Sequence, residues 1–141
     1  MDPHRRELID RLDRLIYSIS QRFAHDVTEA IRGKVTMSQY VVLKILSVCG
    51  QCTVSGVADK MQISTSAVTP LADRLVAMGL IGRYRDEKDR RVVWIHLTQK
   101  GQELIREIED ARRKVVDAFV SKLPEIELNQ LVAILERLVD S

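Results

Sequence analysis

Glycine is confined to the middle of this 141-residue chain, and this distribution is the strongest constraint on its fold. All six glycines lie between Gly33 and Gly101, and neither glycine nor proline occurs from residue 4 to residue 32. Because glycine marks tight turns and helix ends, the two flanks are predicted to form long, uninterrupted helices. The middle is predicted to consist of short elements joined by tight turns.

Apolar residues in both flanks recur in steps of three and four, the spacing that places side chains on one face of an α-helix. A middle of roughly 60 residues is too small to cover faces of this length. We therefore expect the flanks to pack on each other within and between two copies of the chain; the alternative is a helical bundle folded within one chain. The faces consist of Leu8, Leu12, Leu15, Ile16, Ile19, Phe23, Val27 and Ile31 in the N-terminal flank, and of Leu104, Ile105, Ile108, Val115, Val116, Phe119, Val120, Leu128, Leu131, Val132, Leu135, Leu138 and Val139 in the C-terminal flank, where Pro124 divides them.

The middle is predicted to fold into three short helices followed by a β-hairpin. Thr36 and Gln39 have the spacing of a capping box. Thr53, Ser64 and Thr98 are the expected N-caps of the second, third and C-terminal helices. The expected helices span residues 36–50, 53–61 and 65–78, and the expected strands are Ile81–Arg85 and residues 91–97, separated by a charged turn at 86–90. Two helices joined by a short turn, with a hairpin behind them, form a helix-turn-helix with a wing.

The predicted fold class is therefore mainly α with a small β-hairpin wing. A winged helix-turn-helix core at residues 36–97 is flanked by a dimerisation helix at 1–35 and by dimerisation helices at 98–141. The net charge of +2 hides an uneven distribution: the core has eight basic and five acidic side chains, and the C-terminal flank has seven and nine. The basic excess is densest in residues 83–91, with five basic and three acidic side chains.

Several classes of protein are disfavoured. The longest apolar runs are far shorter than the ~18 residues of a membrane-spanning helix, and the first residues lack a signal-peptide apolar segment. With two cysteines, we expect a reduced, cytoplasmic setting and no membrane partner. No nucleophile–base motif, phosphate-binding glycine loop or pair of zinc-ligand motifs occurs, so we expect no enzyme, no cofactor and no metal site.

The third helix and the wing contain the candidate DNA contacts. Hydroxyl side chains on the outer face of the helix would allow close approach to a major groove and bonds to phosphates or base edges. In the wing, Asp89 is placed to hold the Arg91 guanidinium in a bidentate pair, directed into a minor groove. The alternatives are a solvated helix face and a charged hairpin that stays soluble. The helix presents Val68, Leu71, Ala72, Leu75 and Met78 on its packing face and Ser66, Thr69, Pro70, Asp73 and Ala77 on the opposite face.

Residues 35–101 resemble the core of the multiple-antibiotic-resistance regulator (MarR) family, and the helical flanks extend the resemblance to the whole chain. The motifs that carry it are Thr36-Met37-Ser38-Gln39-Tyr40-Val41-Val42-Leu43, Val57-Ala58-Asp59-Lys60-Met61-Gln62-Ile63-Ser64, Ser66-Ala67-Val68-Thr69-Pro70-Leu71-Ala72-Asp73-Arg74-Leu75, Met78-Gly79-Leu80-Ile81-x-Arg83, Asp86-x-x-Asp89-Arg90-Arg91 and Leu97-Thr98-x-x-Gly101. The resemblance implies a homodimeric bacterial transcription regulator, usually a repressor, that binds a pseudo-palindromic double-stranded operator. The alternative is a winged-helix protein-interaction module without specific DNA binding.

The resemblance also implies roles for individual residues. The recognition helix would contact DNA through Ser64, Thr65, Ser66, Thr69 and Arg74. The wing would contact it through Lys88, Arg90 and Arg91, with Asp89 orienting Arg91. Pro70 departs from the basic residue that many members have there and removes a helix hydrogen bond to the carbonyl of Ser66, which predicts a local distortion.

Two further groups of residues are candidates for sensing a signal. The family commonly binds a small aromatic or anionic effector between the dimerisation helices and the core, and Tyr17, His25, Met37 and Tyr40 are the candidates for lining that pocket. The tyrosines equally suit half-buried packing positions. Cys49 and Cys52 form a CxxC: either a redox pair, since some members of the family sense oxidants through cysteine, or a buried structural cysteine followed by a loop cysteine.

Overall fold

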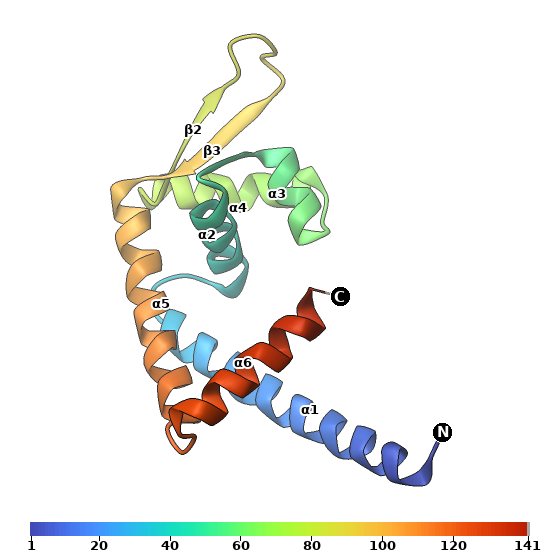
Figure 1. The fold of residues 1–141 in the computed structure, drawn as a ribbon. Coiled ribbons are helices and arrows are strands. Elements are labelled where there is room, and N and C mark those ends of the chain that lie inside the picture. The colour runs from blue at the N-terminus through green and yellow to red at the C-terminus, as the bar shows by residue number, and fades with distance from the viewer. Residues whose placement is uncertain (141) are drawn as a thin grey trace.

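A computed structural model describes residues 1–140 and has the mainly α fold with a winged core that the sequence predicts (Figure 1). The recognition-helix candidate is α4, and β2 and β3 form the wing. In chain order the elements are α1 (Pro3–Ile31), α2 (Met37–Cys49), β1 (Gln51–Thr53), α3 (Val54–Met61), α4 (Thr65–Ala77), β2 (Ile81–Arg85), β3 (Val93–Leu97), α5 (Gln99–Val120) and α6 (Glu125–Val139).

The predicted two-stranded hairpin is part of a three-stranded sheet. Strand β1 pairs antiparallel with β3, which gives the strand order β1-β3-β2. Gly50, with φ of +79°, turns the chain from the end of α2 into β1. Strand β3 begins at residue 93 rather than 91, because the preceding residues close the wing turn: the amide of Asp86 donates to the Val92 carbonyl at 2.9 Å, and the amide of Val92 donates to the Asp89 carbonyl at 3.0 Å.

The N-caps that the sequence predicts are all present. Thr36 accepts from the backbone amide of Gln39 at 3.2 Å, and the Gln39 side chain accepts from the amide of Thr36 at 3.0 Å, which completes the capping box. Thr53, Ser64 and Thr98 each accept a hydrogen bond from the backbone amide three residues later. These caps fix where α2, α3, α4 and α5 begin, because they satisfy amides that the first helical turn leaves unpaired.

The core lies beneath α4, with α2 at its centre. The packing face predicted for α4 is inward: Val68, Ala72 and Leu75 are buried, and the opposite face is exposed. Helix α4 continues through Pro70, which lies on that exposed face. The buried hydrophobic residues are Ile31, Tyr40, Val42, Leu43, Leu46, Val57, Ala58, Val68, Ala72, Leu75, Leu80, Ile81, Ile95, Leu97, Ile105 and Ile108.

Helix α5 is docked closely against the loop that follows α4. The Thr98 hydroxyl donates to the Gly79 carbonyl at 2.6 Å while it caps α5. Gly101 is buried in the first turn, and a Cβ at this position would lie 2.0 Å from the Leu80 carbonyl oxygen. Only glycine permits this approach, so the sequence at residues 97–101 fixes how the winged core meets the long C-terminal helix.

Helices α1 and α6 lie at the end of α5 that is remote from the wing (Figure 1). They leave much apolar surface uncovered in the single chain: only Ile31 is buried in α1, and α6 has no buried residue. An edge-to-face contact between Phe23 and Phe119, with ring centroids 5.3 Å apart, joins α1 to α5. None of the described helices is long and apolar enough to cross a membrane. The exposed apolar residues of α1 and α6 are Leu8, Ile9, Leu12, Leu15, Ile16, Tyr17, Ile126, Val132, Ile134, Leu135, Leu138 and Val139.

Candidate nucleic-acid interface

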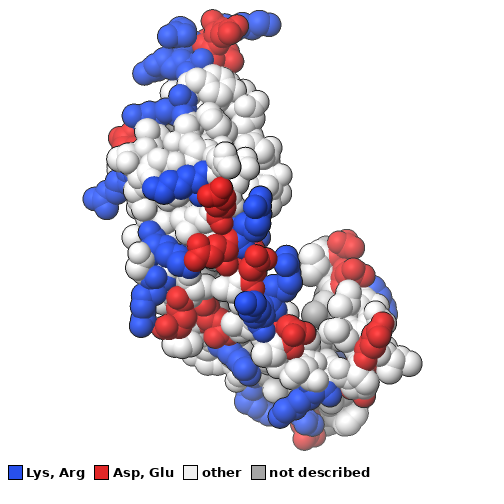
Figure 2. Space-filling model, turned by 90° about the vertical axis from the view of Figure 1, so that its left-hand side faces the viewer, with Lys and Arg blue, Asp and Glu red and all other residues white. Residues whose placement is uncertain are grey.

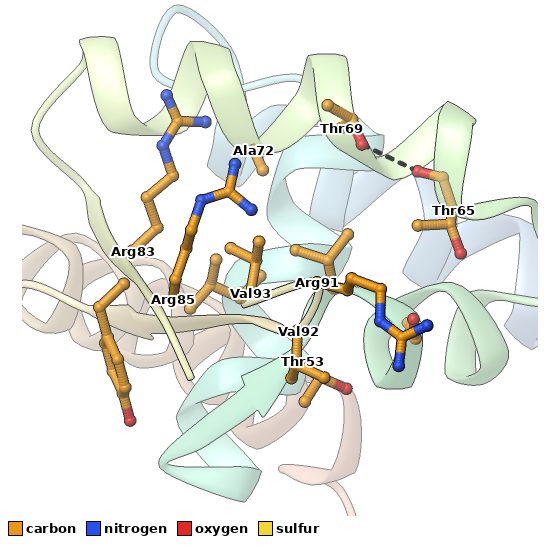
Figure 3. A pocket seen from close by; sticks show the side chains of 13 residues that line it. Thr53, Thr65, Thr69, Ala72, Arg83, Arg85, Arg91, Val92 and Val93 are labelled. Atoms are coloured by element: carbon orange, nitrogen blue, oxygen red, sulfur yellow. Dashed lines mark hydrogen bonds between the residues drawn. The ribbon is translucent and has the colours of Figure 1, made fainter. Parts of the chain in front are cut away.

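A hollow of about 740 Å³ separates the recognition helix from the wing (Figure 3). We call it the helix–wing hollow. Hydroxyl side chains of α4 face basic side chains of the wing across it, and residues at the start of α3 also line it. Hydroxyls and guanidinium groups are the side chains that contact phosphates and base edges in protein–DNA complexes. Its lining residues are Thr53, Val54, Ser55, Thr65, Thr69, Ala72, Arg83, Tyr84, Arg85, Arg91, Val92, Val93 and Ile95.

The outer face of α4 is small, polar and exposed. Its first turn begins at Ser64, whose hydroxyl lies 3.0 Å from that of Ser66. The Thr69 hydroxyl donates to the Thr65 carbonyl at 3.1 Å, so its oxygen keeps accepting capacity (Figure 3). Arg74 is exposed near the end of the helix. The five recognition-helix residues named from the sequence therefore all reach the surface of one short segment.

At the wing tip, Asp89 and Arg91 form the bidentate pair expected from their spacing. The Arg91 Nε donates to Asp89 Oδ1 at 3.1 Å, and its Nη2 donates to Oδ2 at 3.2 Å. The hydrogen bonds from the Arg91 side chain and backbone lower the pKa of Asp89, so the acid is ionised at neutral pH. The Arg91 side chain is 91% exposed despite this pair. The guanidinium is thus held in direction while its outer edge remains open.

Asp86 organises the wing turn, a role that the sequence analysis missed. Its Oδ2 accepts from the backbone amides of Lys88 and Asp89, at 3.3 and 3.1 Å, and its Oδ1 accepts from the Trp94 indole at 3.2 Å. An aspartate that accepts from amides two and three residues later is an Asx-turn. The sequence of the charged turn at 86–90 could therefore have predicted the Asx-turn. The bond to Trp94 could not be predicted in this way, because it depends on the strand pairing.

Arg83 and Arg85 also line the helix–wing hollow and were not among the residues chosen from the sequence. They are two residues apart in β2, and Figure 3 shows both side chains extending toward α4. Arg83 pairs with Asp73 of α4, and the Arg85 Nη1 donates to the Arg90 carbonyl at 2.8 Å. Because residues two apart in a strand share a face, the Arg-x-Arg spacing was the available signal.

Charge is distributed unevenly over the surface. At the top of Figure 2, where the wing tip lies, Lys and Arg side chains flank a group of acidic ones. The face formed by α5 mixes both signs, in keeping with the balance of charge in the C-terminal flank. The basic excess of the wing is therefore one of residue count, with five basic and three acidic side chains in residues 83–91.

The four effector-pocket candidates lie on α1 and α2, and none of them lines the helix–wing hollow. Tyr17 is 66% and Met37 is 42% exposed, and His25 is also exposed. Tyr40 is buried, where its hydroxyl donates to Glu109 at 2.9 Å. An effector pocket formed by these residues remains a prediction.

Tyr40 belongs to a polar cluster that joins α2 to α5. Its hydroxyl also accepts from Arg112 at 3.2 Å, and Lys44 lies 3.0 Å from Glu109. Burial and the bond to Glu109 raise the pKa of Tyr40. Burial alone would raise the pKa of Glu109, but the bonds from Lys44 and Tyr40 outweigh it, so the pKa of Glu109 is lowered. The cluster therefore holds α2 and α5 together through a charged carboxylate.

The cysteines do not lie where the interpretation of the CxxC as a buried structural cysteine followed by a loop cysteine places them. Cys49, expected to continue the apolar face of α2 into the core, is exposed, and Cys52 is half-buried in β1. The last turn of α2, from Ser47 to Cys49, extends past the core and is exposed throughout. The expectation of a buried Cys49 was therefore wrong.

Fold and site together define a class: a winged helix-turn-helix protein that presents a polar recognition helix beside a basic wing. Comparison with known proteins narrows the class. The model of the MarR family matches residues 35–93. The transcriptional repressor MdtR of Bacillus subtilis (strain 168) is 31% identical over 136 residues, which cover 96% of this chain and 88% of the repressor. The chain therefore belongs to the MarR family and is a transcriptional regulator, as its sequence indicated.

Solved structures agree with this assignment. A MarR family protein from Bacillus stearothermophilus has a TM-score of 0.88 at 26% identity, covering 99% of this chain and 96% of that chain. A MepR mutant from S. aureus bound to an oligodeoxyribonucleotide has a TM-score of 0.71 at 26% identity, covering 92% of this chain and 96% of that one. These similarities favour a DNA-binding regulator over a protein-interaction module.

Proposed function

We propose that this protein is a homodimeric repressor that binds a pseudo-palindromic operator with α4 in the major groove and the wing in the adjacent minor groove. The observation that carries the proposal is the helix–wing hollow, where hydroxyls of α4 face three wing arginines. The MepR mutant of the same fold was solved with an oligodeoxyribonucleotide, which supports DNA as the partner.

Each part of the surface has a proposed task. Ser64, Thr65, Ser66, Thr69 and Arg74 contact phosphates and base edges from α4. Arg91, oriented by Asp89, enters the minor groove, where a narrow groove concentrates negative potential. Lys88 and Arg90 contact flanking phosphates and contribute affinity without sequence preference.

Dimerisation is proposed through α1 and α6, whose apolar faces are exposed in the single chain. Burying one leucine contributes about 1.5–3 kcal/mol, and a two-fold axis would repeat every such contact. The same axis would place the two copies of α4 about one helical turn, or ~10 bp, apart on DNA. We propose that the dimer works in the cytoplasm without catalytic activity, and that an effector or an oxidant releases it from DNA.

A mobility-shift titration on DNA from upstream of the protein's own gene tests the proposal. Binding that is saturable, stronger than to a scrambled duplex of equal length and steeply weakened by salt is expected. Equal, weak binding to both duplexes would contradict sequence-specific regulation and favour the protein-interaction alternative.

A further inference from the structure

The CxxC lies at the junction of α2 and β1, beside the last turn of α3. Cys49 is the exposed last residue of α2, and the Lys60 ammonium donates a hydrogen bond to its Sγ at 3.0 Å. Exposed cysteines next to a positive charge are the ones that react with oxidants, because the thiolate is the nucleophile. The bond to Cys49 also raises the pKa of Lys60, which keeps this cation charged.

Cys52 lies in a different environment only three residues away. It is half-buried in β1, and a Cβ built on Gly56 would lie 2.8 Å from its Sγ, so this sulfur packs directly on the first turn of α3. Burial and the neighbouring Cys49 raise the pKa of the Cys52 thiol. The pair thus consists of an exposed sulfur beside a cation and a sheltered thiol close to it.

We propose that Cys49 and Cys52 form an oxidant-sensing dithiol in which Lys60 activates Cys49. A hydroperoxide is the oxidant: the Cys49 thiolate attacks its terminal oxygen, the O–O bond breaks, and Cys49 becomes a sulfenic acid while the alkoxide or hydroxide takes a proton and leaves. The sulfur of Cys52 then attacks the Cys49 sulfur and loses its proton. The S–O bond breaks, water leaves, and an intramolecular disulfide forms. Two thiols are oxidised for each hydroperoxide reduced.

The position of the pair connects it to the wing sheet and to the helix–wing hollow. Cys52 pairs with Ile95 of β3, the central strand of the wing sheet. The preceding residue, Gln51, accepts a hydrogen bond from the Tyr84 hydroxyl of β2 at 2.8 Å. The following residue, Thr53, caps α3 and lines the helix–wing hollow. Drawing Cys52 toward Cys49 therefore displaces β1 relative to the wing and α3, and lowers operator affinity; this consequence rests on the proposed DNA-binding function, whereas the thiol chemistry does not.

The chemistry is tested first on the reduced full-length protein treated with hydrogen peroxide. Intact mass is expected to fall by about 2 Da per chain, with two thiols lost and a Cys49–Cys52 bridge in the unreduced peptide map. Cys52→Ser is expected to stop at a sulfenic acid, about 16 Da heavier. Lys60→Gln is expected to slow thiol loss about fivefold, while Lys114→Gln, a control at an exposed lysine of α5, reacts at the wild-type rate. Unreacted thiols, a disulfide between two copies, or an unchanged rate in Lys60→Gln would each overturn the proposal.

The regulatory consequence is read separately on upstream DNA. The oxidised protein is expected to bind about tenfold more weakly than the reduced protein, with recovery after dithiothreitol. A fully formed disulfide with unchanged affinity would overturn the link to DNA. Reduced protein that fails to bind DNA would instead refute the proposed function and leave the mass and rate results to decide the thiol chemistry.

Discussion

Replacing Asp89 by asparagine separates two roles that its carboxylate can have at the wing tip. As a plain negative charge near DNA it repels phosphates, and neutralising it would strengthen binding. As the group that holds Arg91, it aids binding, and its removal leaves a mobile arginine that must be ordered on the DNA. The two roles predict changes of opposite sign.

The expected magnitude follows from the geometry of the pair. Two side-chain nitrogens of Arg91 are held by Asp89, although the arginine side chain is 91% exposed. Ordering a free arginine side chain costs up to about 2 kcal/mol, which limits the effect to about thirtyfold in affinity. Because an exposed pair restrains only part of that freedom, we expect Asp89→Asn to bind about tenfold more weakly. Arg91→Ala, which removes the contact itself, is expected to lose about 1–3 kcal/mol.

The assay is a fluorescence-anisotropy titration of labelled upstream DNA at fixed salt, with thermal unfolding measured alongside. Glu87→Gln is the matched control: it makes the same change of charge in the same turn, at a side chain that is exposed. The control is expected to bind as tightly as wild type or more tightly. If Asp89→Asn binds as tightly as Glu87→Gln while the melting temperatures agree, the orienting role of Asp89 is refuted.

Three further substitutions test how the fold supports the site. Gly101→Ala places a Cβ against the Leu80 carbonyl, and a denaturant titration should show that the free energy of unfolding falls by about 3 kcal/mol. The control Gln102→Ala, at an exposed position, should show no such loss. Equal stability of the two variants would contradict the close docking of α5. Asp86→Ala removes three hydrogen bonds of the wing turn. We therefore expect altered fluorescence emission from Trp94, the only tryptophan, and weaker DNA binding. Unchanged emission would contradict the role of Asp86 in organising the turn. Leu15→Glu places a charge on the exposed apolar face of α1 and should give monomers in light scattering at micromolar concentration; a persistent dimer would exclude this face from the interface.

Local signals explain why most of the fold could be predicted. The caps at Thr36, Thr53, Ser64 and Thr98 are bonds over three residues, so spacing alone identifies them. The packing face of α4 also follows from helical periodicity. The family resemblance added the roles of residues that composition leaves ambiguous, such as Thr69.

What the sequence did not reveal depends on contacts between distant segments. Strand β1 has three residues, of which two are polar, and it exists through its pairing with β3, more than 40 residues later. Cys49 fits the apolar period of α2, but that period does not tell where the helix leaves the core. The contribution of Arg83 and Arg85 to the helix–wing hollow likewise depends on how the wing is placed against α4.

Hydroxyl-radical footprinting on the upstream DNA shows whether α4 and the wing of each copy bind adjacent grooves. We expect two protected segments related by two-fold symmetry, ~10 bp apart from centre to centre, each with flanking minor-groove protection that Arg91→Ala removes. A single unsymmetrical segment, or a footprint unchanged by Arg91→Ala, would contradict it.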